Sequence, residues 1–155
     1  MASHSKSKVY FFFKNHSFSL KNRTALKKFI ENIFIKEKRI LDSINYIFYT
    51  DQDLLKINRK YLKHNYYTDI ITFTLSEKNN PVIADVYISI DRVRANAINF
   101  KTSFRIELLR VMFHGVLHLC GYRDKTKANL KLMRSKEKQY MLESMKFVSR
   151  NTVSS

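Results

Sequence analysis

Two histidines, His114 and His118, lie four residues apart in a stretch that is otherwise almost entirely apolar. On a helix this spacing places both imidazoles on one face, about 6 Å apart along the axis, where they could bind one metal ion. Gly121 can end such a helix, and Asp124 follows six residues after His118. His114, His118 and Asp124 would give a metal three protein ligands and leave a fourth position for water, which is typical of catalytic zinc sites.

The spacing alone also fits a simpler interpretation, because histidines four residues apart arise by chance and often serve only as hydrogen-bonding groups. Residues 108–119 are apolar nearly all round, so this helix should be buried. Its polar exceptions form one stripe, which consists of Glu107, Arg110, His114 and His118. The polar groups of such a stripe on a buried helix need partners, which are either other protein groups or a ligand at a functional site.

Hydrophobic periodicity predicts the elements that would position these residues. Strands are expected over Val9–Phe13, Ile44–Tyr49, Ile70–Leu75 and Val82–Ile90, with the last two forming a hairpin. Helices are expected over Thr24–Lys38, over Arg92–Asn99 after a cap at Asp91, from a cap at Thr102 or Ser103 to Gly121, and from about Thr126 to Met145. A further helix is expected to begin after a cap at Asp51 or Asp53, with Leu54, Leu55, Asn58 and Leu62 facing inward.

This order of elements predicts a single α+β domain over residues 1–155, in which a small mixed sheet of about four strands is covered by helices and the histidine-bearing helix is buried. Residues 1–8 and about 147–155 are expected to be flexible. The composition, 45% hydrophobic and 14% aromatic residues, is enough for one core and excludes a wholly disordered chain.

Neither a membrane span nor a disulfide framework is expected. No apolar run approaches the roughly 20 residues that cross a bilayer, and one cysteine excludes an intramolecular disulfide or a zinc site made of cysteines alone. The first residues are too polar for a secretory signal, so a cytoplasmic location is expected.

The charge balance favours a polyanionic partner. Lys and Arg number 29 and Asp and Glu 13, which gives a net charge of +16 and indicates nucleic acid as the first candidate. The alternative is compositional bias: the chain is rich in Lys, Asn, Ile, Phe and Tyr and has only 2 Gly and 1 Pro, as an AT-rich genome would encode. The excess is spread along the chain, so no single run defines a binding surface.

The histidine segment His114–Tyr122, HGVLHLCGY, closely resembles the H-G-x-L-H-L-x-G-Y-D-H signature of the YbeY family, bacterial metal-dependent endoribonucleases. Thr68–Phe73 resembles the family's T-D/N-V-L-S-F strand, and Asp85–Ser89 resembles its D-I-x-I-S strand. The resemblance runs in the same order from about Leu55 to Tyr140. It implies a single α+β domain that binds one zinc ion and hydrolyses single-stranded RNA. The implied biological role is maturation of the small-subunit ribosomal RNA precursor and ribosome quality control.

Three positions depart from the family pattern. Asp124 stands where the family has a third histidine; a carboxylate is a good zinc ligand, but two histidines and one carboxylate also suit iron(II) or manganese. Leu62 occupies the position of an arginine, whose cation would stabilise developing charge at a scissile phosphate. Ala84 replaces a glycine.

Other cations could take over the missing role. Arg59, one helical turn before Leu62, is the leading candidate for the catalytic cation, and Arg123 is a second. Lys60, Lys63 and Arg123 are candidates for contacts with the RNA backbone.

Two alternative functions stay open. A ribosome-assembly factor that binds RNA without cutting it, with a structural metal, is favoured by the departures at Leu62 and Asp124. A peptide-cleaving metallohydrolase is suggested by the histidine pair alone, but the positive charge and the missing glutamate of H-E-x-x-H argue against it, because Gly115 follows His114. The sequence indicates neither the oligomeric state nor the general base.

Overall fold

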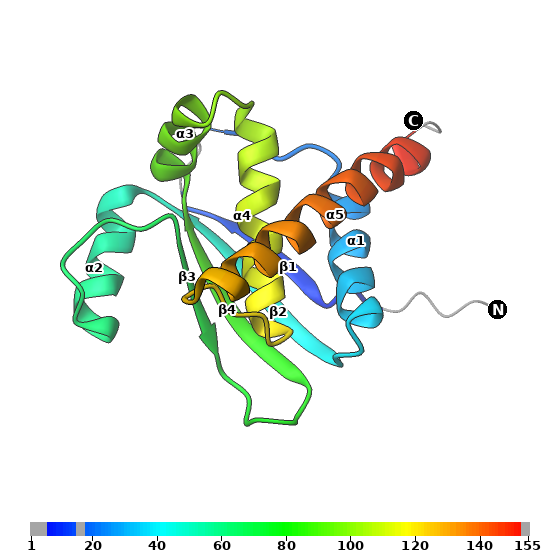
Figure 1. The fold of residues 1–155 in the computed structure, drawn as a ribbon, viewed down its shortest axis with the longest axis horizontal. Helices are drawn as coiled ribbons and strands as arrows, with labels where there is room; N and C mark the ends of the chain where they lie inside the picture. Colours follow the sequence, from blue (N-terminus) through cyan, green and yellow to red (C-terminus); the bar gives the residue numbers. More distant parts are fainter. Residues whose placement is uncertain (1–5, 15–17, 153–155) are drawn as a thin grey trace.

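A computed structural model of the chain describes residues 6–14 and 18–152 (Figure 1). Its elements, in chain order, are β1 (Val9–Phe13), α1 (Arg23–Lys36), β2 (Leu41–Tyr49), α2 (Asp51–Leu62), β3 (Ile70–Thr74), β4 (Val82–Ser89), α3 (Ile90–Asn99), α4 (Phe104–Leu119) and α5 (Lys127–Thr152). The order of elements expected from the sequence is confirmed.

The four strands form one mixed sheet in the order β1-β2-β4-β3. β1 pairs with β2 and β2 with β4 in parallel, and these connections run through α1 and α2, since parallel strands need a crossover. β3 and β4 are antiparallel neighbours and form the expected hairpin. The α+β architecture with a small mixed sheet is therefore confirmed.

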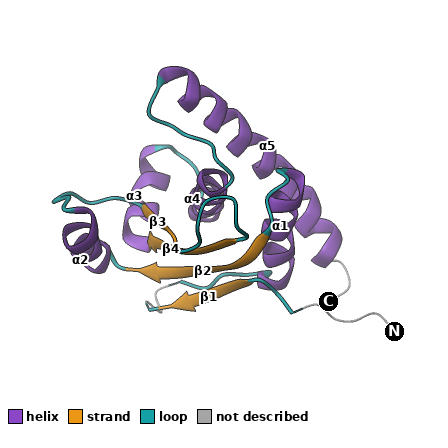
Figure 2. Ribbon diagram, turned by 90° about the horizontal axis from the view of Figure 1, so that it is seen from below, coloured by secondary structure: helices purple, strands orange, loops and turns teal. Residues whose placement is uncertain are grey.

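The helices α4 and α1 pack on one face of the sheet, and α5 lies across these two helices (Figure 2). Alternate residues of β2, namely Ile44, Tyr46 and Phe48, are fully buried beneath them, as the two-residue period of a strand requires. The residues between them are only partly buried on the other face. The core therefore lies between the sheet and the helical layer, and α4 runs through its middle.

The helix α4 is the buried, histidine-bearing element that the sequence predicts. It begins after Ser103, whose hydroxyl accepts a hydrogen bond from the Ile106 N–H at 3.1 Å. Gly115 faces the sheet, where a Cβ at this position would lie 2.9 Å from the Ile70 side chain, so α4 approaches the sheet closely. Of the described helices, none is both long and apolar enough to cross a bilayer.

Three details of the sequence prediction are wrong. The cap of α2 is Thr50, whose hydroxyl accepts from the Asp53 N–H at 3.2 Å, and the cap of α3 is Ser89, whose hydroxyl accepts from the Arg92 N–H at 3.1 Å. In both cases a hydroxyl residue just before the expected acidic cap already satisfies the first turn. Leu62, expected to face inward, is 40% exposed.

The flexibility expected at the two ends of the chain stays a prediction. α5 continues beyond the expected end at Met145 as far as Thr152. Residues 1–5 and 153–155, where flexibility is expected, lie outside the described residues.

Candidate metal centre

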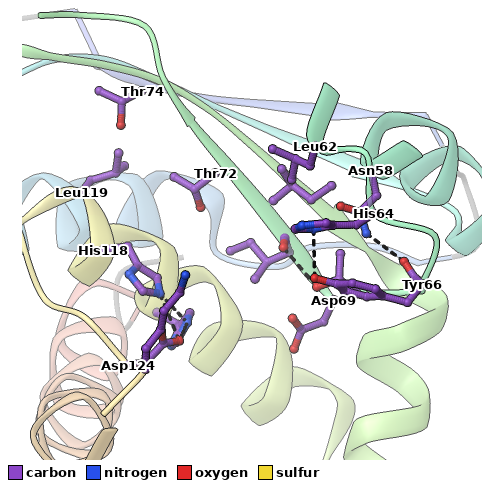
Figure 3. Close-up of a pocket in the computed structure, with 15 residues that line it drawn as sticks. Asn58, Leu62, His64, Tyr66, Asp69, Thr72, Thr74, His118, Leu119 and Asp124 are labelled. Atoms are coloured by element: carbon purple, nitrogen blue, oxygen red, sulfur yellow. Dashed lines mark hydrogen bonds and ion pairs between the residues drawn. The ribbon is translucent and has the colours of Figure 1, made fainter. Parts of the chain in front are cut away.

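The histidines of α4 and the loop that follows it bring three possible ligand atoms together (Figure 3). His114 Nε2 lies 2.9 Å from His118 Nε2, and Asp124 Oδ2 lies 3.3 Å from each of these nitrogens. All three side chains are half-buried. The structure thus brings together the three residues that the sequence predicts as metal ligands.

The end of α4 explains how Asp124 reaches the histidines. Gly121 has a φ of 103°, a left-handed conformation that favours glycine. The Gly121 N–H donates to the His118 carbonyl at 3.0 Å and the Tyr122 N–H to the Leu117 carbonyl at 2.9 Å, which is the Schellman arrangement of a helix end. The chain turns back here, so Asp124 faces the helix it has just left.

The Nδ1 atom of each imidazole faces an oxygen atom. His118 Nδ1 is 3.0 Å from the Tyr122 carbonyl oxygen, which can only accept, so Nδ1 is the donor of this hydrogen bond. His114 Nδ1 faces Glu137 Oε2 at 3.6 Å, and within the described residues neither atom has a hydrogen-bond partner. The Nε2 atoms of both imidazoles and a carboxylate oxygen of Asp124 converge on one point.

This donor set fits a metal ion. Ligand atoms held at about 2.0–2.2 Å by one tetrahedral zinc ion lie about 3.3 Å apart, close to the three separations seen here. Each histidine also directs its second nitrogen at an oxygen, as histidines that bind metals usually do. Two imidazoles and one carboxylate suit zinc, and equally iron(II) or manganese.

A buried charge network lies behind His114 and provides partners for Glu107 and Arg110, the other two residues of the polar stripe. The Arg110 guanidinium donates to both oxygens of Glu107 at 2.7 Å and to Glu137 Oε1 at 2.8 Å. Glu107 and Glu137 are almost fully buried. Burial acts to raise the pKa of Glu137, but the contact with His114 and the attraction of Arg110 outweigh it and hold this pKa below its ordinary value.

The polar stripe of α4 therefore has two uses. Its first half, Glu107 and Arg110, is satisfied by protein partners, whereas its second half, His114 and His118, opens into a cavity of about 580 Å³. The cavity lies between α4, β3 and the segment from α2 to β3 (Figure 3). Asp69 on its wall lies 3.8 Å from Arg110, and burial, the largest influence, raises the pKa of Asp69 despite the attraction of Arg110.

The other predicted site residues lie outside this cavity. Arg59 donates from Nε to the Asn65 side-chain oxygen at 2.5 Å, and the exposed Lys60 and Lys63 likewise do not line the wall. Arg123 borders a separate cavity beside Glu37 and Tyr122. Leu62, where the family resemblance implies an arginine, does line the wall.

Sequence reasoning missed other residues of the wall. Lys125 is a cation among the described lining residues, and its position directly after Asp124 could have indicated it. Asn58, His64, Tyr66 and Asp69 also line the cavity. Asp69 falls in the strand motif Thr68–Phe73, which was the available signal for it.

Comparison with known proteins places this chain in a family. The family model described as "Endoribonuclease YbeY" matches residues 8–145. Curated relatives named Endoribonuclease YbeY include those of Cytophaga hutchinsonii, 44% identical over 85% of this chain and 93% of the relative, and Amoebophilus asiaticus, 42% identical over 88% and 93%. The solution structure of TM1509 from Thermotoga maritima is similar, with a TM-score of 0.64 and 27% identity over 95% of both chains.

The site and fold are thus those of an α+β protein with a candidate metal centre on a buried helix. The chain belongs to the YbeY family of endoribonucleases. The resemblance drawn from the histidine segment and the two strand motifs is confirmed.

Proposed function

We propose that this chain is a metal-dependent endoribonuclease that cleaves single-stranded RNA at the cavity beside α4. The observation that carries the proposal is the convergence of His114 Nε2, His118 Nε2 and Asp124 Oδ2 on one point at the cavity wall. Membership of a family of endoribonucleases supports RNA as the substrate. The net charge of +16 supports a polyanionic ligand.

Each residue of the centre has a proposed task. His114, His118 and Asp124 would hold a divalent cation, proposed to be zinc, which when bound would activate water and polarise a phosphoryl oxygen. The Tyr122 carbonyl holds the His118 imidazole in orientation through Nδ1, and Glu137, whose Oε2 faces His114 Nδ1 at 3.6 Å, is proposed to orient the His114 imidazole when the metal is bound. Lys125, on the cavity wall, is placed to contact a phosphate of the substrate.

Arg59 is proposed as the cation that replaces the arginine missing at Leu62. Its side chain is tied to Asn65 in the structure, so it would have to exchange this exposed hydrogen bond for a phosphate. Arg59→Ala should then lower the cleavage rate by about 100-fold and RNA binding much less, and Leu62→Arg should keep or raise activity. Unchanged cleavage by Arg59→Ala, with a large loss in Lys125→Ala, would assign the role to Lys125 instead.

Lys60, Lys63 and Arg123 are proposed to contact the RNA backbone outside the cavity. The proposed biological substrate is the small-subunit ribosomal RNA precursor, with the ribosome as partner and the cytoplasm as location. The support for these finer assignments is the family resemblance of the histidine segment and the positive charge of the chain.

The decisive experiment combines metal analysis with cleavage. Protein purified without added metal is analysed for its metal content and then incubated with single-stranded RNA, with and without chelator. We expect bound metal and cleavage that the chelator abolishes, and neither in His114→Ala prepared to matched purity. Equal cleavage by the wild type and His114→Ala would indicate a contaminating nuclease and favour an assembly factor that binds RNA without cutting it.

A further inference from the structure

An exposed pair of aromatic rings lines the same cavity as the metal ligands, on its other side (Figure 3). The rings of His64 and Tyr66 are stacked, with centroids 5.0 Å apart and planes 19° apart. The Tyr66 hydroxyl lies 2.9 Å from His64 Nδ1, which holds the two rings together. Tyr66 is 57% exposed, unlike Tyr46 and Tyr140, which are buried in the core.

The backbone beneath this pair is fixed by a buried residue. Asn58 of α2 is 1% exposed, and its Nδ2 donates to the Tyr66 carbonyl at 2.8 Å. The His64 N–H donates to the Asn58 carbonyl at 3.1 Å. The next residue, Tyr67, accepts a hydrogen bond from the Gln52 side chain at 2.8 Å. The rings are therefore held in place before any ligand arrives, which lowers the entropic cost of binding.

We propose that His64 and Tyr66 form a subsite that stacks one nucleobase of the RNA, while the adjoining phosphate lies toward His114, His118 and Asp124. This inference rests on the proposed function and adds to it a contact with the base. Exposed aromatic faces stack on any base, and single-stranded RNA presents unstacked bases to such surfaces.

The rest of the cavity suits a nucleotide. Leu62 adds an apolar wall on the side of the rings, and Lys125 places a cation on the side of the metal ligands. A volume of about 580 Å³ lies within the range of small-molecule sites. The cavity thus has an aromatic and apolar side for a base and a charged side for a phosphate.

The test uses single-stranded RNA that carries one fluorescent 2-aminopurine, placed at successive positions in a series of oligonucleotides. Binding and fluorescence are measured in chelator, and the integrity of the strand is checked on a gel. We expect binding to quench the fluorescence at a defined position. Tyr66→Ala should abolish this quenching and weaken binding by roughly 10-fold, whereas Tyr66→Trp should retain both, because it keeps a ring face.

A matched control is Tyr61→Ala. Tyr61 is 60% exposed at the end of α2 and lies outside the cavity lining, so its loss should leave binding and quenching unchanged. Thermal unfolding checks that each variant is folded.

The outcomes separate the subsite from the proposed function. Tyr66→Ala that binds and quenches like the wild type overturns the subsite, even if the wild type cleaves RNA in a metal-dependent way. Quenching that depends on Tyr66 without any cleavage supports the subsite and overturns the nuclease. A wild type that fails to bind RNA overturns the subsite, and its cleavage assay still decides the nuclease.

Discussion

The two carboxylates closest to the histidines differ in what they face. Asp124 is half-buried and faces both Nε2 atoms, so it belongs with the ligands. Glu137 is almost fully buried, faces His114 Nδ1 and is held on its other oxygen by Arg110. Carboxylates in this second position usually orient the imidazole of a histidine that binds a metal.

Removing the charge of Glu137 should therefore weaken metal binding without removing a ligand. We expect Glu137→Gln to lower metal affinity by about 10–100-fold, measured by competition with a chromogenic chelator. Glu143→Gln is the matched control, because Glu143 lies on the same helix but pairs with Lys36 at the surface. Equal metal affinity in Glu137→Gln and the wild type would limit Glu137 to a structural role with Arg110.

The ligands could be predicted from the sequence because their positions follow from local rules. Helical periodicity places His114 beside His118, and a glycine that ends a helix lets Asp124 fold back. Asn58 reaches the site from α2, Tyr66 from the loop before β3 and Glu137 from α5, and how these segments approach α4 depends on packing between distant parts of the chain. The spacing of residues in the sequence therefore does not predict which of these distant residues lie beside the histidines.

At the scale of elements, the position of α4 depends on the small size of Gly115. A Cβ there would lie 2.9 Å from Ile70 Cδ1 and 3.4 Å from Val86 Cγ1. Because α4 carries both histidines, any displacement from β3 and β4 would also move the metal centre. The glycine thus links the packing of the helix to the geometry of the site.

Gly115→Val should destabilise the fold by about 1–3 kcal/mol, since the three carbons of an isopropyl group enter a filled contact. Gly115→Ala should be nearly neutral, because the flexible end of Ile70 can move aside and alanine favours a helix by about 1 kcal/mol over glycine. Urea unfolding at neutral pH measures both variants. Gly115→Val as stable as the wild type would contradict a close contact between α4 and the sheet.

A second link between elements is formed by Glu37, at the end of α1. It accepts hydrogen bonds from Tyr122, after α4, at 2.6 Å and from Tyr140 of α5 at 2.5 Å, and Lys136 lies 3.6 Å away. Burial acts to raise the pKa of Glu37, but the two tyrosine hydroxyls and Lys136 outweigh it, so this pKa lies below its ordinary 4.5. The link also holds the residue whose carbonyl accepts from His118.

A lowered pKa in the folded state means that this carboxylate stabilises the fold fully above its unfolded pKa, and that the contribution is lost as the pH falls through the folded pKa. Glu37→Gln should be less stable than the wild type by about 1–3 kcal/mol at neutral pH, and the difference should shrink as the pH falls below the ordinary pKa of 4.5 and through the lower folded pKa. Urea unfolding at several pH values measures this. Glu77→Gln, in the exposed loop between β3 and β4, is the control, and a difference for Glu37→Gln that is constant with pH would contradict the assignment.

The elements were predictable in type and order because each has a clear hydrophobic period. The residues that cap the helices were less predictable. Thr50 and Ser89 each precede an aspartate that could also cap the helix, and only the hydrogen bonds of the structure show which residue does so. The strand order β1-β2-β4-β3 was not predicted, because local patterns do not say which parallel strands become neighbours.

At the scale of the whole molecule, the arrangement of charge favours an anionic ligand. Glu107 and Glu137 are buried and paired with Arg110, so these acidic residues do not offset the surface lysines and arginines. The net charge of +16 is thus expressed mainly at the surface, where a net positive charge favours polyanionic ligands in general. What must be distinguished is general attraction from contacts that hold RNA in the cavity.

The salt dependence of RNA binding makes this distinction. Each phosphate neutralised by the protein should contribute about −0.7 to the slope of log affinity against log salt for a single strand, so several contacts give a steep decline. Lys125→Ala should reduce the magnitude of this slope by about 0.7, because Lys125 lines the cavity, whereas Lys28→Ala, on α1 and outside it, should leave the slope unchanged. Fluorescence anisotropy over a series of salt concentrations measures the RNA affinity of all three proteins.

Two outcomes would contradict this assignment. A flat salt dependence in the wild type would mean that the lysines reflect the base composition of the genome rather than contacts with RNA. Equal slopes for the two variants would mean that the cavity holds no phosphate at Lys125.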